Sequence, residues 1–553
     1  MDTTSTRAAT KGEPLEPPAV SSDGVVRPSW WRCCLSGLLA AAVALAVGEL
    51  VSGFSAELTS PVISVGNQFV DAVPGSLKDF AIQTFGTNDK KALLIGIYIV
   101  ASIFGLLLGF LAGRRFWIGA VGIAAFGAVG AWASVSEVGA PWWAVLPSLI
   151  GAVVGVAALG LLLATVDGAD HPLIAARALQ VASRGEPGEQ SERQQSTPGR
   201  RGFLKVSGAV VVLGAVAAVG GRWLQSRFSA AASRLAVVLP KPKRSAGPVP
   251  DGVDLGIKGI APFVTPNSDF YRIDTNLTVP QIAAETWSLK IKGMVDDELE
   301  FSYDEILAMP MVEERITLTC VSNEVGGGLV GNARWLGVPL VDLIEQAGID
   351  PGADQVVGRA FDGFTTGFPV DILRDGRPSL LAVGMNGEPL PLAHGFPARV
   401  VVPGLYGYVS ATKWLTEIEL TTFASFDQYW VERDWSAEGP IKTMARVDTP
   451  RGLQRVAPGK VPIGGVAWAQ TRGIQRVEVK IDDGPWIEAR LAAQDSKLTW
   501  RQWVYDWDAT PGRHQVTARA TDSTGQVQVE ERAKPFPNGA SGWHSVAVLV
   551  NDQ

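Results

Sequence analysis

Residues 316–324 read Ile-Thr-Leu-Thr-Cys-Val-Ser-Asn-Glu, an apolar stretch that runs into a polar turn, and the glycines 326–328 follow directly. The apolar half predicts a strand, and the glycines allow the backbone to approach another group closely. Cys320 therefore stands where a strand opens into a loop, which is where sites are usually built. A lone free cysteine is most often a small buried apolar residue. Because the chain holds no other cysteine after residue 34, we interpret Cys320 as a metal ligand instead.

Five blocks of the sequence are similar to one protein family. Cys320–Asn323 resembles the Cys-x-x-Asn motif of the sulfite oxidase family of molybdopterin enzymes. The other four blocks occur in the family's order and are Thr265–Arg272, Met385–Pro391, His394–Arg399 and Pro403–Trp414. The resemblance covers residues 262–553. It implies an α+β sulfite-oxidase-type molybdopterin domain and a molybdenum-molybdopterin cofactor whose metal is bound by Cys320.

The resemblance also implies the residues of the site. Cys320 and Arg272 would serve catalysis, Arg272 by meeting an anionic substrate. The residues that would hold the pterin or its phosphate, or line the site, are Asn267, Tyr271, Arg272, Cys320, Asp362, Thr365, Thr366, His394, Arg399, Thr412 and Lys413.

Three of these residues can also be weighed by their chemistry alone. Arg399 and Lys413 lie beside Pro/Gly-rich loops, and both are suitable partners for a phosphate. His394 would donate or accept a hydrogen bond rather than bind the metal. Without the resemblance, Arg399 reads equally well as part of a surface salt bridge, and His394 as a hydrogen-bonded core histidine.

Two positions depart from the sulfite oxidases that this chain resembles. Glu324 and Val325 stand near the place of an arginine that follows the metal-binding cysteine, and Phe364 aligns with a tyrosine near the metal. A dianion such as sulfite needs several cations at close range, and a glutamate there opposes its binding. We therefore expect sulfite to be a poor substrate, and neutral oxides such as sulfoxides, or larger organic substrates, to fit better.

The composition indicates that part of the chain lies in lipid. Apolar residues make up 47% of the 553 residues, charged residues make up 19%, and the mean hydropathy is +0.17, which is too apolar for a purely soluble protein. Four apolar runs before residue 170 reach the roughly 20 residues that cross a membrane, and a shorter fifth run follows. They lie near residues 34–53, 92–112, 116–134, 142–166 and 206–220.

The arginines predict the orientation of these helices. Arginines precede the first run, separate the second from the third and follow the fourth, which places the N-terminus in the cytoplasm, although Lys90 and Lys91 fall on the outer side. Gly199–Lys205 resembles a twin-arginine export signal with glycine in place of the usual serine or threonine, while ordinary positive-inside charge also explains Arg200 and Arg201. Ala230–Ala232 could be a cleavage site, but we favour a retained anchor.

After residue 440 the sequence alternates between polar and apolar residues in short runs. Arg476–Ile481, the turn at Asp482–Gly484 and the return strand Trp486–Leu491 predict a hairpin. Further strands are expected at 500–507, 515–520 and 544–550. This pattern predicts an all-β sandwich, and it resembles the immunoglobulin-like dimerisation domain of the same family.

The expected organisation is a multi-domain chain. It comprises a disordered cytoplasmic tail at 1–32, four transmembrane helices at 33–166, a cytoplasmic linker at 167–205, a fifth transmembrane helix at 206–223, an extracytoplasmic linker at 224–261, the molybdopterin-binding oxidoreductase domain at 262–439 and the immunoglobulin-like dimerisation domain at 440–553. The N-terminal helices thus form a membrane bundle, and the catalytic domain lies outside the cell membrane.

The sequence also bounds the partners. The four histidines fall outside the predicted helices and no Cys-x-x-Cys-His occurs, so we expect no haem and a separate electron acceptor or donor. A net charge of −7 gives no reason to expect nucleic acid. We expect an oxidoreductase that moves an oxygen atom and two electrons to or from a small-molecule substrate, that contacts membrane lipid and that forms a homodimer. The alternative is a non-catalytic exported binding or scaffold module that kept the fold.

Overall fold

The computed structural model describes residues 28–55, 57–74, 77, 84–85, 89–171 and 200–551. The predicted disordered tail, apart from its last residues, and the central part of the predicted cytoplasmic linker lie outside the described residues. The chain forms two compact units. Met1–Ala72 and Thr84–Arg227 make up the first unit, and Val73–Gln83 and Phe228–Gln553 make up the second.

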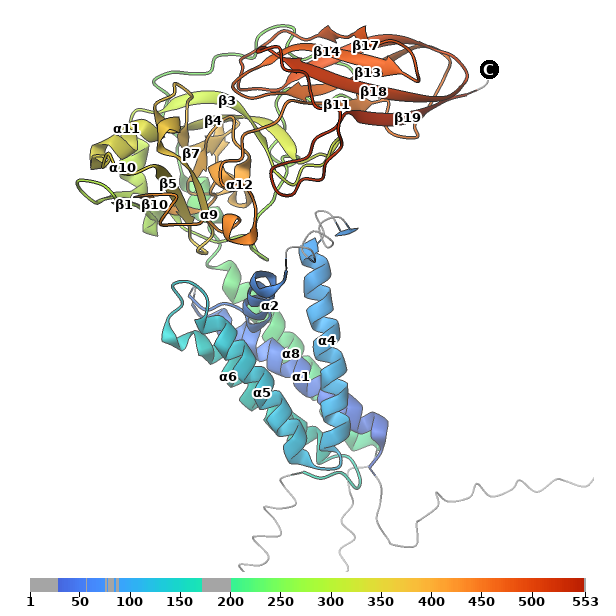
Figure 1. Cartoon of the computed structure of the whole chain (residues 1–553). Coiled ribbons are helices and arrows are strands. Elements are labelled where there is room, and N and C mark those ends of the chain that lie inside the picture. Colours follow the sequence, from blue (N-terminus) through green and yellow to red (C-terminus); the bar gives the residue numbers. More distant parts are fainter. Residues whose placement is uncertain are drawn as a thin grey trace, which may run out of the picture. The chain divides into compact units, whose positions relative to one another are not determined.

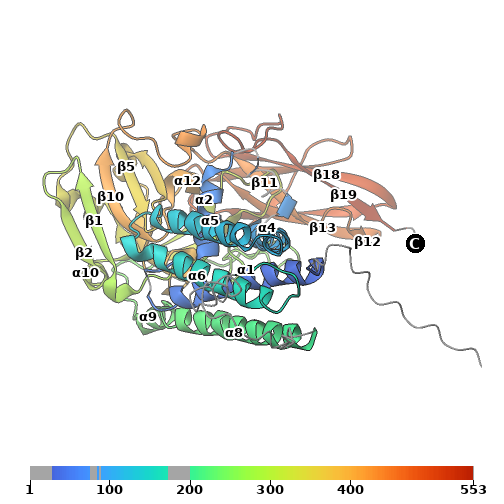
Figure 2. The same ribbon diagram turned by 90° about the horizontal axis from the view of Figure 1, so that it is seen from below.

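The first unit is a bundle of helices (Figure 1). Its helices are α1 (Trp30–Ser52), α2 (Pro61–Ala72), α4 (Asp89–Ala112), α5 (Phe116–Val135), η2 (Trp142–Val145), α6 (Leu146–Leu163) and α8 (Arg200–Ser226). Helix α1 lies at the centre and packs against α4, α6 and α8, as Figure 2 shows from below. A side chain at Gly37 or Gly109 would overlap the backbone of the facing helix, so these glycines allow α1 and α4 to approach closely.

Five helices of this unit are long and apolar enough to cross a membrane. They cover Trp30–Ser52, Lys90–Ala112, Phe116–Val135, Trp142–Leu163 and the segment Arg200–Ala236. Two differences from the prediction stand out. The last helix begins at Arg200 rather than after residue 205, so both arginines lie in its first turn. Helix α2 was not predicted, because its 12 residues are too few for a span and its start is marked only by Pro61.

The second unit begins with two sheets that build the 262–439 region. One sheet has the order β2-β1-β10-β5-β6 and the other the order β3-β4-β7-β8, with β9 also paired to β7. The strands are β1 (Ser288–Gly293), β2 (Leu299–Ser302), β3 (Val312–Thr319), β4 (Val330–Pro339), β5 (Gln355–Ala360), β6 (Thr365–Pro369), β7 (Leu380–Met385), β8 (Glu388–Pro389), β9 (Arg399–Val401) and β10 (Leu415–Thr421). Their short helices are α9 (Ala231–Ala236), α10 (Tyr303–Ala308), α11 (Leu340–Ile344) and α12 (Gly407–Ser410). Only β1 and β10 pair in parallel within these sheets, so the architecture is α+β.

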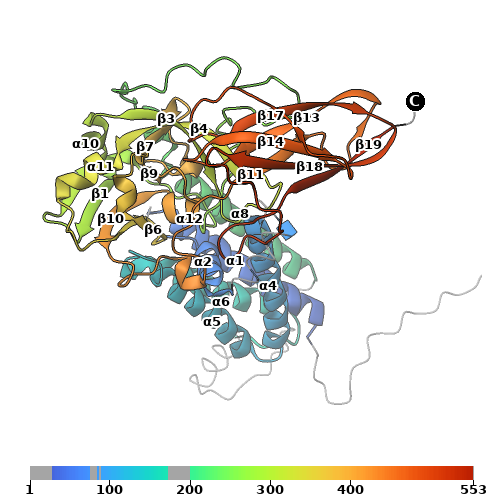
Figure 3. The same cartoon turned by 45° about the horizontal axis from the view of Figure 1, so that its top comes forward.

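The C-terminal region is rich in β-structure, as predicted, and its two sheets can be followed in Figure 3. One sheet has the order β11-β13-β17-β16 and the other β12-β19-β18-β14-β15. The strands are β11 (Met444–Thr449), β12 (Arg455–Val456), β13 (Gly459–Trp468), β14 (Ile474–Ile481), β15 (Ile487–Glu488), β16 (Arg490–Leu491), β17 (Arg501–Ala509), β18 (Gly512–Asp522) and β19 (His544–Val550). Apolar residues from both sheets, among them Val477, Trp503 and Val516, are buried in one cluster.

The two regions of the second unit share part of one core. Trp468 and Trp500 from the C-terminal region are buried within the main cluster of the 262–439 region. The backbone N–H of Trp500 donates to Thr317 Oγ1 (2.8 Å) and its indole donates to the Phe263 carbonyl (2.8 Å). The 440–553 region is therefore part of the same folded body and not an appended module.

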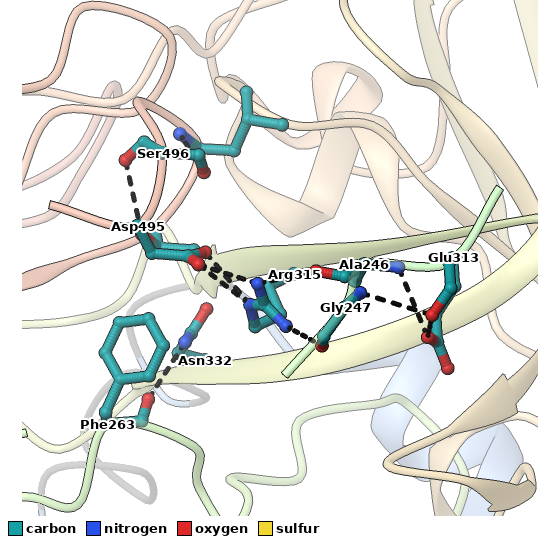
Figure 4. A network of polar contacts seen from close by, with 11 residues as sticks. Ala246, Gly247, Phe263, Glu313, Arg315, Asn332, Asp495 and Ser496 are labelled. Atoms are coloured by element: carbon teal, nitrogen blue, oxygen red, sulfur yellow. Dashed lines mark hydrogen bonds and ion pairs between the residues drawn. The ribbon is translucent and has the colours of Figure 1, made fainter. Parts of the chain in front are cut away.

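A buried ion pair reinforces this junction (Figure 4). Arg315 on β3 binds Asp495 with an Nη2–Oδ1 distance of 2.7 Å, and the two side chains are 7% and 6% exposed. Its remaining N–H groups donate to the carbonyls of Ala246 (2.8 Å) and Gly247 (2.9 Å). The segment that the sequence presents as a linker is thus held along the edge of β3.

Candidate functional site

The loop after β3 is held in place by its own backbone and by Asn323. Cys320 N–H donates to the Leu329 carbonyl (2.9 Å), and Asn323 N–H donates to the Cys320 carbonyl (3.1 Å). The side-chain oxygen of Asn323 then accepts from Leu329 N–H (2.8 Å). The Cys-x-x-Asn spacing therefore closes the loop on itself, which leaves Cys320 at the end of a buried strand.

Cys320 is 8% exposed, and its surroundings raise the pKa of the thiol. Burial is the main cause, and it is opposed by hydrogen bonds with Ser322 and by the charge of Lys413. A thiol in such a place stays protonated until a metal ion replaces the proton. Within the described residues, no group of three or more His, Cys, Asp or Glu side chains is placed to hold a metal ion.

Two tyrosines lie close enough to Cys320 for its charge to affect them. Burial raises the pKa of Tyr406 to about 12, and the Cys320 thiolate adds to this shift while Lys442 and Arg472 oppose it. Burial also raises the pKa of Tyr271 far above its usual range, with Cys320 adding and Arg399 opposing. Both phenols therefore keep their protons at neutral pH.

Three cations, Arg272, Arg399 and Lys413, lie around His394, and two of them bind one carboxylate. Asp274 Oδ2 lies 2.6 Å from Lys413 Nζ and 2.7 Å from Arg272 Nε. Arg399 is 5% exposed, and within the described part of the chain its guanidinium bonds to backbone carbonyls, those of His394 (3.2 Å), Ala411 (3.3 Å) and Val400 (3.4 Å).

Burial lowers the pKa of Lys413 to about 8 and that of Arg399 to about 10. Three positive charges against one negative charge leave an excess that a buried anion would neutralise. The donor set therefore fits the phosphate of a pterin cofactor.

His394 lies among these cations as a neutral imidazole. Its Nε2 lies 3.1 Å from the Asn267 carbonyl, and its ring packs edge-on against Phe270 with centroids 5.5 Å apart. Burial, together with the charges of Arg399, Lys413 and Arg272, lowers its pKa to about 4. Since a carbonyl only accepts, Nε2 carries the proton, which leaves Nδ1 as an acceptor.

The other predicted site residues fall into two groups. Thr366 and Thr412 are fully buried and their hydroxyl oxygens lie 2.6 Å apart. Asp362 accepts from Phe364 N–H (3.1 Å) and from the amide of Asn276, and burial raises its pKa, with the nearby Asp274 adding to the rise. Asp274 thus connects Asp362 with the cations.

Thr365 and Asn267 have mainly structural contacts. Thr365 Oγ1 accepts from Tyr429 N–H (2.9 Å). The Asn267 amide donates to Glu388 Oε1 (2.5 Å) and its oxygen accepts from Asn386 (2.8 Å). Asn267 therefore reaches His394 through its backbone, and its side chain fixes the turn at 385–388.

The sequence reasoning missed Asp274 and Tyr406 as site residues. Asp274 lies two residues after Arg272, so in extended backbone both side chains point to the same face, and this spacing was a usable signal. Tyr406 belongs to the Pro403–Trp414 block, but nothing in that block distinguishes its phenol from a packed aromatic ring.

The structure also changes the argument about sulfite. Glu324 is exposed, so water screens its charge. Phe364 packs against Tyr429 with ring centroids 5.2 Å apart. Solvent therefore weakens the repulsion between Glu324 and a bound anion, and the expectation of weak sulfite binding stays a prediction.

Comparison with known proteins connects this geometry to a family. Residues 276–430 match the family described as oxidoreductase molybdopterin binding domain. This domain belongs to the sulfite oxidase family of molybdopterin oxidoreductases. Mitochondrial sulfite oxidase of Homo sapiens is 29% identical over 342 residues, which cover 52% of this chain and 62% of that enzyme. The uncharacterized oxidoreductase YuiH of Bacillus subtilis is 39% identical over 135 residues, which cover 24% and 65% of the two chains.

The chain spans less than two thirds of the length of these sulfite oxidase family relatives. A solved structure of the sulfane dehydrogenase SoxCD from Paracoccus pantotrophus aligns with 54% of this chain and 85% of its own, at 23% identity and a TM-score of 0.47. The family match implies a molybdenum-molybdopterin cofactor, and the site described above has a thiol and an excess of positive charge to receive it.

Proposed function

We propose that the chain is a membrane-anchored molybdopterin-dependent oxidoreductase that transfers an oxygen atom and two electrons outside the cytoplasmic membrane. One observation carries the proposal: the buried thiol of Cys320 lies near Lys413, one of three cations around His394, and Lys413 and Arg272 bind the same carboxylate, that of Asp274. A redox cofactor supplies the chemistry of such a site, and the protein supplies binding, orientation and electrostatics.

The chain's own residues would divide these tasks. Cys320 would bind the molybdenum, and Arg399 and Lys413 would hold the phosphate. His394, Tyr271, Thr366 and Thr412 would contact the pterin through hydrogen bonds. Arg272 is 30% exposed, so it remains accessible to an anionic substrate.

Two residues bear on the substrate class. With Glu324 exposed to water, its charge opposes an anion only weakly, and Arg272 is left to meet an oxyanion, so sulfite stands as a candidate beside the neutral oxides that the sequence suggested. Sulfite and methyl sulfoxides are therefore the two substrates to compare under one artificial electron carrier.

The remaining parts of the proposal concern location and assembly. The five apolar helices and the arginine bias support an N-terminal membrane bundle with a cytoplasmic N-terminus, and Arg200–Arg201 would act as the twin-arginine signal. The two sheets that enclose a common core support an immunoglobulin-like sandwich. A homodimer through this sandwich is part of the proposal and rests on the resemblance to the family. Electrons would pass to a separate acceptor.

Replacement of Cys320 by serine tests the proposal. In a molybdenum-replete host, Cys320→Ser should keep the fold but lose activity and lose or alter the bound molybdenum. The matched control is Cys33→Ser/Cys34→Ser, which should retain both. A wild-type protein that contains no molybdenum would favour the non-catalytic binding or scaffold module instead.

A further inference from the structure

Two residues of the C-terminal region contact the glycine run that follows Cys320. Arg446 on β11 donates from Nη1 to the Gly327 carbonyl (2.9 Å). His544, the first residue of β19, accepts from Val447 N–H at Nδ1 (3.0 Å). The Nε2 edge of the same ring occupies the space where a side chain on Gly326 would lie.

Both contacts are themselves fixed by buried partners. Arg446 Nε lies 2.5 Å from Asp448 Oδ1, and the two side chains are 11% and 8% exposed. Asp448 Oδ2 accepts from Ala261 N–H (3.0 Å). Because β11 and β19 bring Arg446 and His544 to the same loop, a rigid sheet rather than a flexible tail meets the glycines.

The loop needs such support. Three consecutive glycines give its backbone wide conformational freedom, and Gly326 has a φ of +83°. Within the loop, Asn323 bonds to the residues at both ends, while Gly326 and Gly327 lie between these anchor points.

We propose that Arg446 and His544 are positioning residues, which clamp Gly326 and Gly327 and thereby fix the direction of the Cys320 thiol. The C-terminal region then takes part in building the site, in addition to any role in dimerisation. The effect on a bound metal rests on the proposed function, whereas the clamp itself does not.

The test uses the full-length chain without cofactor. In a Cys33→Ser/Cys34→Ser background, Cys320 is the only thiol, and its alkylation by iodoacetamide is followed by mass spectrometry. His544→Asn keeps an acceptor for Val447 N–H but removes the ring edge beside Gly326. We expect His544→Asn, Arg446→Gln and Gly326→Ala each to speed alkylation about tenfold or more, because the loop opens more often.

Gly328→Ala is the matched control. No atom lies within 4 Å of the place its side chain would take, so its rate should stay within about twofold of the parent, as for a surface substitution. Hydrogen exchange at residues 320–329 should accelerate in the clamp variants and not in this control. Parental alkylation rates in both Arg446→Gln and His544→Asn would overturn the proposal.

A milder variant separates positioning from general stability. Arg446→Lys keeps the positive charge beside Asp448 but loses the planar fork that reaches Gly327. With molybdenum bound, it should retain the metal and the thermal midpoint while the Mo(V) electron paramagnetic resonance signal shifts. An unchanged signal together with an unchanged alkylation rate would show that Arg446 only joins the two regions.

Discussion

His394 is a histidine whose charge depends on the cations around it. Burial and the charges of Arg399, Lys413 and Arg272 lower its pKa to about 4, against an ordinary value of 6.5. The unfolded chain therefore binds a proton at His394 more readily than the folded chain does. The contribution of His394 to the free energy of unfolding is thus complete above pH 6.5 and falls as the pH drops toward 4. The loss from this residue amounts to about 3 kcal/mol at most.

The variant His394→Gln tests this dependence. Glutamine can still donate to the Asn267 carbonyl, but it does not titrate. The drop in thermal midpoint between pH 7 and pH 4.5 should be smaller in the variant than in the parent, as measured by calorimetry. Equal drops in both proteins would show that His394 binds a proton as readily in the folded chain as in the unfolded chain.

Single residues differ in how far sequence alone could place them. The resemblance to a family, rather than residue type or spacing, assigned Cys320, Arg399 and Lys413 to one site, and in the structure the charge of Lys413 acts on Cys320 and the charge of Arg399 acts on Lys413. Partners that lie far apart in the sequence could not be predicted. Asp274 meets Lys413 only because the loop that holds Asp274 packs against the segment that holds Lys413, and no local pattern reports such packing. The same holds for the exposure of Glu324, which only the turn geometry decides.

At the scale of elements, Trp500 joins the C-terminal region to β3. It is 2% exposed, and both its backbone and its indole are hydrogen-bonded across the junction. Trp500→Ala should cost about 3 to 5 kcal/mol through the cavity it leaves. Trp500→Phe should cost only about 0.5 to 1.5 kcal/mol, because it removes one hydrogen bond while the Asn332 amide still donates to the Phe263 carbonyl (2.8 Å).

Denaturant unfolding of the two variants measures these losses. Trp142, which is 77% exposed, provides the control. Trp142→Phe should leave the free energy of unfolding of the second unit unchanged. If Trp500→Ala unfolds only the C-terminal strands in a separate transition, the two regions do not form one folded body.

The elements themselves were predictable to different degrees. Long apolar runs are sufficient to locate α1, α4, α5 and α6, because a membrane-length helix has few alternatives. Alternating residues located β14, β18 and β19, with β19 at the expected bounds. The predicted strand at 486–491 divides instead, since β15 pairs with β14 in one sheet and β16 pairs with β17 in the other. Such a change of sheet depends on which strand at the edge of each sheet still has unpaired backbone groups, and the local alternation of polar and apolar residues does not predict it.

At the scale of the whole molecule, the segment after α8 bears on whether the anchor is retained. Ala230 follows the end of α8 at Ser226 after only three residues and is 2% exposed in the core of the second unit. Its N–H donates to Gln281 Oε1 (3.1 Å), and Arg234 donates to the carbonyls of Leu390 (2.8 Å) and Pro389 (2.6 Å). Ala230 is thus buried and hydrogen-bonded, whereas Ala231 and Ala232 are exposed but lie in the first turn of α9, where Arg234 N–H donates to the Ala230 carbonyl (2.8 Å). A buried residue followed by a folded helix protects this backbone from proteolysis.

A peptidase that cleaves at Ala230–Ala232 would have to unfold this segment, and a chain exported in its folded state would not offer it. We therefore expect the mature protein to keep its N-terminal helices, to resist extraction from membranes by carbonate, and to show the full-length mass. The variant Arg234→Ala/Gln281→Ala removes the bonds that hold the segment and should yield a soluble fragment. Lys241→Ala, a change outside these bonds, should not. A soluble parental fragment that begins near Ser233 would show that the helices act only as a transient export signal.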